Sequence, residues 1–280
     1  MKNDYCISHT KDNRTSPIYF HSHDFYEIYL FMDGNVKYYI ENESYVLSRG
    51  NILIIPPGKL HRPVFDGDFP YERYVLWIYH PNTLANTGIR RYIEAVDRMT
   101  EAKNTHLASF DSKSRKTLTD LFDRLLACFQ STDPLAPYTG ESCILFILDA
   151  ILQNLKSKKR VTQESGELIP QVISYINQNV AHAPSLDALS ARFFVSKYHL
   201  SHKFKEHTKT TIHQYILMKK VNLAKELLKT GLSPQEVSVR CGFSTYSNFY
   251  KVFTGQTGMS PRQFYALAIS ALKCYDKSNQ

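Results

Sequence analysis

The sequence lacks any run of about 18 consecutive apolar residues, the length that a helix needs to cross a bilayer. Its first residues, Met1 to Cys6, are too polar to form the apolar segment of a secretory signal. Cysteine is scarce as well: the five cysteines are odd in number, and no two of them lie close together. This pattern excludes a disulfide framework and a cysteine metal site. We therefore expect a cytoplasmic protein with reduced thiols and no membrane partner.

Acidic side chains are scarce in the last third of the chain. From residue 168 onward there are 14 Lys and Arg against 5 Asp and Glu, whereas residues 1–167 carry 20 against 21. The whole excess of positive charge therefore lies at the C-terminal end. Such segregation favours a polyanionic partner, and nucleic acid above all. The 280 residues, of which 43% are hydrophobic, suffice for two domains with separate cores.

A helix-turn-helix pattern is present in this basic region. Ser185 and Ser196 are suitable N-caps for helices at 186–192 and 197–207. On the second of these helices, spacing places polar and basic side chains on one face and Leu200 and Phe204 on the other. One face is therefore expected to be buried and the other to meet a partner.

The same pattern occurs a second time. Ser233 precedes Pro234 at the first helical position, Gly242 suits a turn with positive φ, and Ser244 is expected to cap a helix through Phe253. In the first copy Phe194 takes the place of Gly242, so its turn is expected to be made differently. A helix at about 212–229, with a broad apolar face, joins the two copies.

The residues of the second copy are distinctive. CGFSTYSNFYKVF at 241–253 follows Leu-Leu-Lys at 227–229 and precedes TGMSP at 257–261 and Phe264. This stretch resembles the signature of AraC-type bacterial transcription regulators. The resemblance covers about the last hundred residues and implies that the second helix of each copy enters the major groove of double-stranded DNA.

Carried over by position, the resemblance implies two sets of DNA contacts. Base edges would be read by Tyr198, Ser201 and His202 in the first copy and by Tyr246, Ser247, Tyr250 and Lys251 in the second. Phosphates would be contacted by Ser196, Lys197, Thr245 and Asn248. His202 departs from the family pattern, because many relatives carry Arg there.

The region from Ile18 to Tyr79 alternates apolar or aromatic residues with polar ones. It predicts short antiparallel strands at 25–32, 36–40, 44–47, 52–55 and 74–79, which together suggest a small barrel or sandwich. Residues 1–17 are polar and irregular. They are expected to be either a disordered tail or, as the family suggests, an arm that folds over a bound effector.

Two segments of this β region resemble the paired motifs of cupin barrels. They are His21-x-His23-x-x-x-Glu27 and Gly50-x5-Pro56-x-Gly58-x2-His61. Side chains alternate along a strand, so the first two histidines and Glu27 should point into the barrel. Three histidines and a carboxylate also suit a transition metal. Cupin domains joined to AraC-type domains resemble small-metabolite sensors, however, so we expect no metal and no cofactor. The expected lining of an effector pocket is His21, His23, Glu27, Tyr29, His61, Arg73 and Trp77.

Helical periodicity begins near residue 90. Helices are expected at 117–130 and 142–156, with Pro134 and Pro137 breaking the chain between them, and another at 171–179. The broad apolar surface of the helix at 142–156 suits a homodimer, although these helices could simply cap the barrel. The expected fold is α+β in two domains. Residues 1–85 form an arm and a cupin-like barrel, 86–156 form dimerisation helices, 157–167 form a linker, and 168–280 form an all-α double helix-turn-helix domain.

These features together predict a ligand-responsive, sequence-specific DNA-binding transcription regulator that is not an enzyme. It is expected to be an activator of carbohydrate or other small-metabolite genes, with a small-molecule effector such as a sugar and with RNA polymerase as a partner. Two rivals stay open. One is a metal-dependent cupin enzyme, an isomerase or dioxygenase, with an attached DNA-binding domain. The other is a regulator controlled by a protein partner, which a barrel filled by its own Phe and Tyr side chains would favour.

Overall fold

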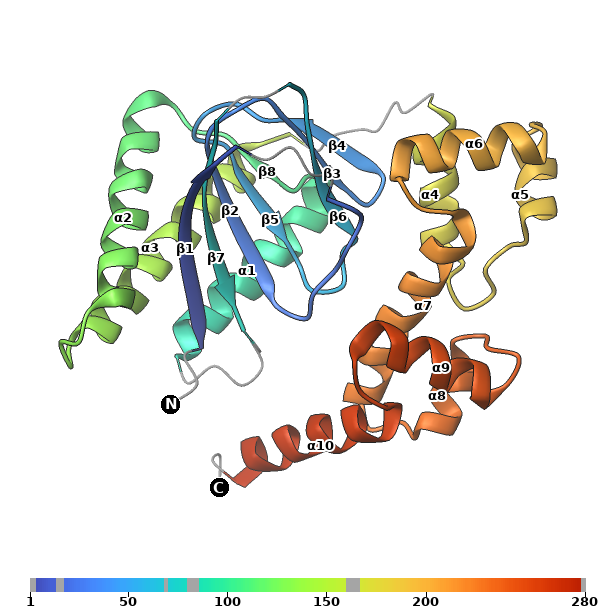
Figure 1. Cartoon of the computed structure of the whole chain (residues 1–280). Helices are drawn as coiled ribbons and strands as arrows, with labels where there is room; N and C mark the ends of the chain where they lie inside the picture. Colours follow the sequence, from blue (N-terminus) through green and yellow to red (C-terminus); the bar gives the residue numbers. More distant parts are fainter. Residues whose placement is uncertain (1–3, 14–17, 68–69, 80–85, 160–166, 278–280) are drawn as a thin grey trace. The chain divides into compact units, whose positions relative to one another are not determined.

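The computed structural model describes residues 4–13, 18–67, 70–79, 86–159 and 167–277, with side chains up to residue 269. Its internal contacts divide the chain into two units, Met1–Glu164 and Ser165–Gln280 (Figure 1). Most of the expected linker at 157–167 lies outside the described residues. The α+β, two-domain fold class predicted from the sequence is confirmed.

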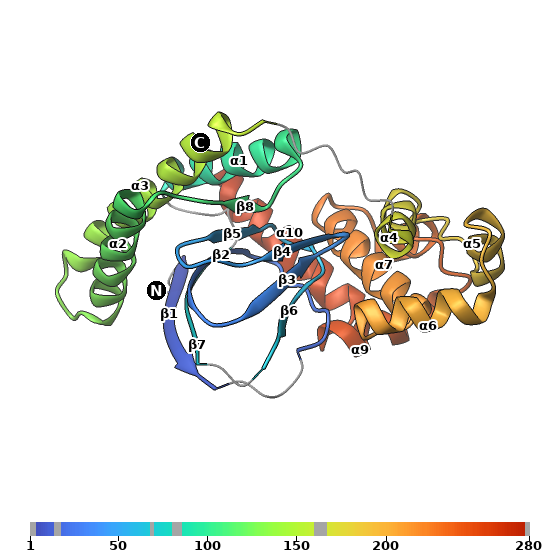
Figure 2. The same ribbon diagram turned by 90° about the horizontal axis from the view of Figure 1, so that it is seen from above.

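The N-terminal unit is built on two antiparallel sheets, which Figure 2 shows facing each other. The five-stranded sheet has the order β1 (Tyr5–Asp12), β7 (Tyr71–Ile78), β2 (Tyr26–Asp33), β5 (Ile52–Ile55) and β8 (Leu107–Ala108). The three-stranded sheet has the order β4 (Glu43–Val46), β3 (Val36–Ile40) and β6 (His61–Phe65). Antiparallel pairing throughout agrees with the short strands and turn signals of the sequence.

Strand β2 lies between two hydrophobic cores. Its alternate residues Ile28 and Leu30 pack with the helices, whereas Tyr29 and Phe31 face the three-stranded sheet. Seven of its eight residues are therefore buried. The alternation places the side chains of the odd-numbered residues of β2 on the side that faces the three-stranded sheet, as expected from strand geometry.

Helices α1 (Thr87–Lys103), α2 (Ser112–Gln130) and α3 (Ala136–Ser157) supply the other side of the first core. Pro137 was expected to keep the chain out of a helix, but it lies in the first turn of α3. Proline is tolerated there because its missing N–H would have no intrahelical partner. None of the described helices combines the length and apolar character that a bilayer crossing requires.

The N-terminal segment differs from its prediction. Residues expected to be irregular form β1, which pairs with β7 from Tyr5 opposite Ile78 to Asp12 opposite Tyr71. In β1 only Ile7 is fully buried, because this is an edge strand with one half-exposed face. A sequence with a single buried apolar residue shows little strand periodicity. Strands β6 and β8 were also not predicted from the sequence.

The C-terminal unit contains only helices among its described residues. They are α4 (Leu168–Gln178), α5 (Leu186–Arg192), α6 (Lys197–Thr208), α7 (Ile212–Lys229), α8 (Pro234–Arg240), α9 (Tyr246–Thr257) and α10 (Pro261–Lys277). Helix α7 joins the helix pairs α5–α6 and α8–α9, with the bounds predicted from its apolar face. Helix α9 is capped by Thr245, whose hydroxyl accepts the N–H of Asn248, and not by Ser244. Helix α4 begins two residues before Pro170, which again occupies a first turn.

The turns of the two helix pairs are made in the same way, contrary to expectation. Phe194 has a φ of 54° and Gly242 a φ of 67°, and both lie in the left-handed region. The hydrogen bond from the Val195 N–H to the Ser190 carbonyl, at 3.1 Å, matches that from Phe243 to Ser238. A left-handed phenylalanine is strained, but here its side chain is 95% exposed and meets no obstacle.

Candidate functional site

Helices α6 and α9 are positioned alike by their apolar faces. Leu200 and Phe204 of α6 are fully buried, as are Phe249 and Phe253 of α9. The opposite faces of both helices are largely exposed. The structure therefore presents two similar helices whose outward surfaces carry the residues that the sequence assigned to DNA.

On α6 the outward face contains an aromatic pair. Tyr198 is 81% exposed, and its ring stacks on that of His202 with centroids 6.1 Å apart. Ser201 lies beside them and is half-buried. These three side chains offer a hydroxyl, an imidazole and flat apolar surface, which suit both hydrogen bonding to base edges and contact with a thymine methyl group.

On α9 three of the four expected base-reading residues are exposed, namely Ser247, Tyr250 and Lys251. Tyr246 differs from them, because its half-buried ring packs edge-on against Phe249 at 5.8 Å. Part of the role of Tyr246 is therefore to anchor the start of α9 on the core of the unit.

The expected phosphate contacts lie at the starts of the same two helices. The hydroxyls of Ser196 and Thr245 accept the N–H groups of His199 and Asn248, so each is held at a helix N-terminus, where anions are favoured. Lys197 is exposed and forms an ion pair with Asp187. A phosphate would have to compete with this carboxylate for the ammonium group.

Lys220 is a positioning residue that the sequence analysis missed. From α7 its Nζ donates a 2.6 Å hydrogen bond to the carbonyl of Gly242 and lies 5.3 Å from the centroid of the Phe243 ring. Burial lowers the pKa of this lysine. The bond ties the turn of the second helix pair to the connecting helix, and no local sequence signal identifies such a contact.

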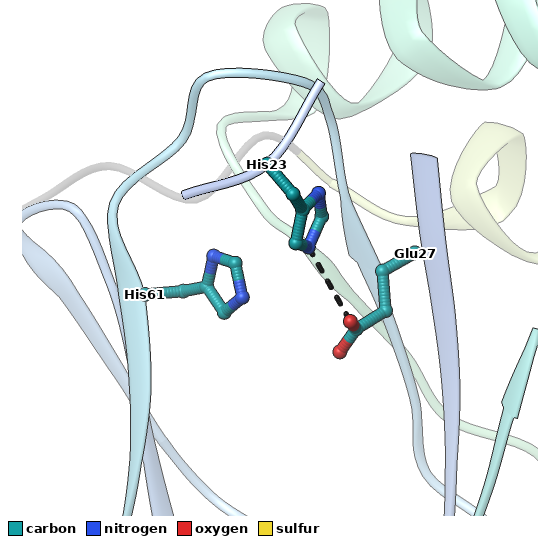
Figure 3. Close-up of side chains that lie close together, drawn as sticks. All are labelled: His23, Glu27 and His61. Atoms are coloured by element: carbon teal, nitrogen blue, oxygen red, sulfur yellow. Dashed lines mark ion pairs between the residues drawn. The ribbon is translucent and has the colours of Figure 1, made fainter. Parts of the chain in front are cut away.

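In the N-terminal unit, His23, Glu27 and His61 converge, as Figure 3 shows. Glu27 lies on β2, His61 begins β6, and His23 precedes β2. Backbone hydrogen bonds between His21 and His61, in both directions, hold this preceding segment against β6. One potential ligand atom from each of the three side chains lies within 4.8 Å of the others. The cluster therefore joins the two sheets.

Hydrogen bonds orient the carboxylate of this cluster. Trp77, directly opposite Glu27 on β7, donates its Nε1–H to Oε2 at 3.0 Å. Burial raises the pKa of Glu27, but interactions with His23, His61 and Trp77 outweigh it, and the pKa lies below its usual value. Burial lowers the pKa of His61 to about 3, so this imidazole is neutral at pH 7. Tyr38, which also interacts with Glu27, was not among the predicted residues.

Apart from Trp77, the other expected pocket residues do not contribute to the group formed by His23, Glu27 and His61. His21 is exposed, and its ring bonds to the carbonyl of Tyr19. Tyr29 is buried and bonded through its hydroxyl to Tyr71. Arg73 forms a 2.8 Å ion pair with Asp12 of β1 and lies four residues from Trp77, about 13 Å along a strand. The structure thus separates the expected lining into a histidine cluster and an arginine–tyrosine cluster.

Between the sheets the space is occupied by the unit's own side chains. Aromatic rings are prominent among them: Tyr29, Phe31, Tyr38 and Tyr71 are buried there, and Tyr45, Phe65 and Trp77 pack at the margin. The sequence analysis named such filling as the feature that would favour a regulator controlled by a protein partner, with no small effector.

A half-buried histidine, His106, makes the stability of the N-terminal unit depend on pH. Its Nδ1 donates to the carbonyl of Ile54 at 2.9 Å, and burial, with the charge of Lys59, lowers its pKa to about 4. In the unfolded chain the pKa is about 6.5, so acid protonates the unfolded state first. The contribution of the neutral His106 to the free energy of unfolding is therefore fully present above about pH 6.5. It is lost as the pH falls toward 4. Between pH 7 and pH 4.5 the titration of this histidine alone should lower the free energy of unfolding by about 2–3 kcal/mol.

Urea unfolding at pH 7 and pH 4.5 measures this loss. In His106→Asn the amide group can keep the bond to Ile54 but does not titrate, so its acid destabilisation should be smaller by about that amount. His61 continues to titrate in both proteins. An equal loss in the two proteins would show that His106 does not titrate as stated.

Two family models match this chain. Residues 5–137 match a family described as "AraC-like ligand binding domain", and residues 189–266 match a family described as "Helix-turn-helix domain". The two matches fall within the two units of the structure and include the histidine cluster and helices α6 to α9.

Curated relatives resemble the chain over most of its length. An uncharacterized HTH-type transcriptional regulator, YfiF of Bacillus subtilis, is 27% identical over 88% of this chain and 78% of its own. The HTH-type transcriptional activator RhaR of Mannheimia succiniciproducens is 23% identical over 89% of this chain and 87% of its own. Among solved structures, apo ToxT from Vibrio cholerae aligns over 94% of this chain and 97% of its own, with 12% identity and a TM-score of 0.41.

Proposed function

Because this chain belongs to the AraC family of transcription regulators, we propose that it activates transcription by placing α6 and α9 in successive major-groove segments of one operator half-site. The observation that carries this proposal is the repeated helix pair with exposed polar faces on α6 and α9. The excess positive charge of the C-terminal part supports it. Activation is suggested by the relative named as a transcriptional activator.

The further parts of the proposal concern partners. The protein acts in the cytoplasm as a homodimer, so that two double modules meet two half-sites, and it recruits RNA polymerase rather than catalysing a reaction. Phe146 of α3, which is 63% exposed, together with the exposed Leu135 and Tyr138, supports dimerisation through this helix. An isologous dimer would bury these three side chains on both copies.

The division between base reading and phosphate binding gives a direct test. Lys251→Ala should cost about 1–3 kcal/mol on the cognate sequence and relax the preference at one base position. Lys197→Ala should weaken binding to all sequences by a similar factor, because phosphates carry no sequence information. Fluorescence anisotropy with promoter-proximal DNA and single-base variants of it measures both effects. Equal losses on every sequence for both variants would refute this assignment.

The N-terminal unit is proposed to sense a small molecule, with sugars as the first class to examine. Repeating the anisotropy titration with a panel of sugars tests this part. If a sugar changes the affinity of the protein for DNA by some factor, DNA must change the affinity of the protein for that sugar by the same factor. A shift caused by one sugar would support the proposal.

A second candidate is favoured by the filled space between the two sheets. The rings of Tyr29, Tyr38 and Tyr71 are buried together between the two sheets. In this alternative a protein partner controls the regulator. DNA binding that no sugar or other metabolite alters would support it, whereas effector binding between the sheets would exclude it.

A further inference from the structure

Helix α7 by itself does not fix the distance between the two helix pairs of the C-terminal unit. Phe204 of α6 packs edge-on against Tyr215 near the start of α7, with ring centroids 5.6 Å apart. Further along α7, Val221, Ala224 and Leu228 share a core with α8 and α9. A long helix that carries a helix pair at each end can bend, and bending would change the separation of α6 and α9.

Helix α4 begins a second connection between the two helix pairs. It is held on the first pair, because the ring of Tyr175 lies edge-on to that of Phe193 at 6.1 Å and 4.1 Å from the guanidinium of Arg192. It is also bonded to α7, where the hydroxyl of Tyr215 donates to Oδ1 of Asn177 at 3.3 Å. The end of α4 is therefore fixed relative to the first helix pair.

The segment that follows α4, residues 179–184, reaches the turn of the second helix pair (Figure 1). The carbonyl oxygen of Ala181 approaches Gly242 so closely that an added Cβ would lie 1.9 Å from it. In glycine a hydrogen takes the place of this Cβ and points at the oxygen, as in the Cα–H···O contacts of adjacent backbones. A segment that precedes the first helix pair is therefore in direct backbone contact with the second.

Lys220 closes these connections into a ring. From the middle of α7 its Nζ donates to the carbonyl of Gly242 at 2.6 Å, so the turn is held both by α7 and by the segment after α4. Contacts thus lead from the first helix pair through α4 and Ala181 to the second pair, and back through Lys220 and α7. A change in the angle between the pairs must break a contact of this ring, which makes the ring stiffer than α7 alone.

The equivalent turn of the first helix pair forms without such contacts. Phe194 takes the place of Gly242 there, and its side chain is 95% exposed. Both residues are left-handed, with φ of 54° and 67°, and the same backbone hydrogen bond closes both turns. The contacts of Ala181 and Lys220 are therefore not needed to make the turn itself, and their effect is on the placement of the second helix pair.

A fixed separation matters for a protein that contacts two segments of one DNA. Successive major-groove segments lie about 34 Å apart, and one extra base pair between them moves one segment by about 3.4 Å and rotates it by roughly 35°. We propose that the brace formed by Ala181, Gly242 and Lys220 fixes the separation of α6 and α9 and makes the protein select operators by the spacing between the two contacted segments. This role rests on the DNA binding proposed above, and Lys220 acts in it as a positioning residue.

Fluorescence anisotropy of the full-length protein on three operators tests this role. They are the promoter-proximal operator and versions with one base pair inserted or deleted between the two segments of each half-site. Single-base variants locate the segments, because His202→Ala and Lys251→Ala should each relax the preference in one of them. The wild type should bind the altered operators at least about 30-fold more weakly, since only one of the two helices keeps its base contacts.

Lys220→Met removes the hydrogen bond to Gly242 and keeps the length of the side chain. Binding to an altered operator then no longer has to break this bond, so the spacing penalty should be smaller by about 3- to 10-fold, the factor that one hydrogen bond contributes. The penalty is a ratio of two affinities of the same protein, so a partly unfolded sample does not alter it. If Lys220→Met does not fold, Lys220→Gln, whose amide is one bond shorter than the lysine chain, takes its place.

Two further variants separate this effect from a loss of charge. Lys220→Arg can still donate to the carbonyl of Gly242 and should keep the penalty of the wild type. Lys229→Met removes the same charge from the same helix, but Lys229 pairs with Glu226 on α7 itself, so its penalty should also be unchanged.

The outcomes distinguish this role from the proposed function. Equal affinity of the wild type for the three operators, or an equal penalty in the wild type and Lys220→Met, would overturn the role of the brace and leave DNA binding intact. Failure of the wild type to bind any of the three operators would overturn the proposed function, and the role of the brace with it.

Discussion

Replacing Gly242 by alanine is expected to destabilise the C-terminal unit more than any other single change considered for this protein. The new Cβ would lie 1.9 Å from the backbone oxygen of Ala181, in the segment between α4 and α5. Backbone atoms cannot swing aside as a flexible side chain can. The φ of 67° adds a left-handed strain of about 1–2 kcal/mol for any residue with a Cβ.

We expect a total loss above about 3 kcal/mol, a large fraction of the 5–15 kcal/mol that stabilises a typical domain. Urea unfolding followed by circular dichroism measures it in the full-length protein. DNA binding should weaken in parallel, because the turn at Gly242 positions the start of α9 and is tied to α7 by Lys220.

Phe194 supplies the matched control at the equivalent turn. Its φ is nearly the same, but its side chain is 95% exposed. Phe194→Gly should therefore remain within about 1 kcal/mol of the wild type, since relief of left-handed strain offsets the greater freedom of glycine in the unfolded chain. Equal stability of Gly242→Ala and the wild type would show that the approach of Ala181 is not as the structure has it.

The second large expected effect is a steep dependence of DNA affinity on salt. If each complex contacts six to ten phosphates, the logarithm of the association constant should fall with the logarithm of salt concentration with a slope of roughly −5 to −9. Between 50 and 200 mM salt the affinity should then drop by about 10³ to 10⁵. Anisotropy titrations of the full-length protein at several salt concentrations measure the slope.

Two lysines separate the contribution of the DNA-contacting surface from that of net charge. Lys197→Ala should reduce the magnitude of the slope by about 1, because one phosphate contact is lost. Lys37, on β3 of the N-terminal unit, lies over the ring of Tyr39, far in the sequence from α6 and α9. Lys37→Ala changes the net charge equally and should leave the slope unaltered. The same change of slope in both variants would indicate a charge effect without specific contacts.

Local sequence signals predicted the helices of the C-terminal unit closely. Capping side chains at Ser185, Ser196 and Ser233 and the apolar face of α7 are local features, and the helices begin and end where these features place them. Proline was misjudged at Pro137, because its effect depends on whether it falls in a first turn. The edge strand β1 was missed because an edge buries too little to impose periodicity.

In the candidate sites, too, local sequence predicted some features, whereas others depend on contacts between distant segments. The resemblance to the cupin motifs placed His21, His23, Glu27 and His61 in one group, of which the structure brings His23, Glu27 and His61 together. Helical spacing placed exposed residues on α6 and α9. The sequence could not reveal that Arg73 pairs with Asp12 or that Tyr29 bonds to Tyr71. Strand register and the pairing of distant strands decide those contacts.

The sequence by itself therefore determined the family, the two-domain order and the outward faces of the helices that are proposed to read DNA. Periodicity, caps and charge are properties of neighbouring residues, and they act before the chain folds. Only the tertiary structure decided that Gly242 faces Ala181, that aromatic rings pack together between the sheets, and that His23, Glu27 and His61 meet there. These outcomes depend on packing between segments far apart in the chain, where a shift of one residue in register exchanges the buried and exposed faces of a strand.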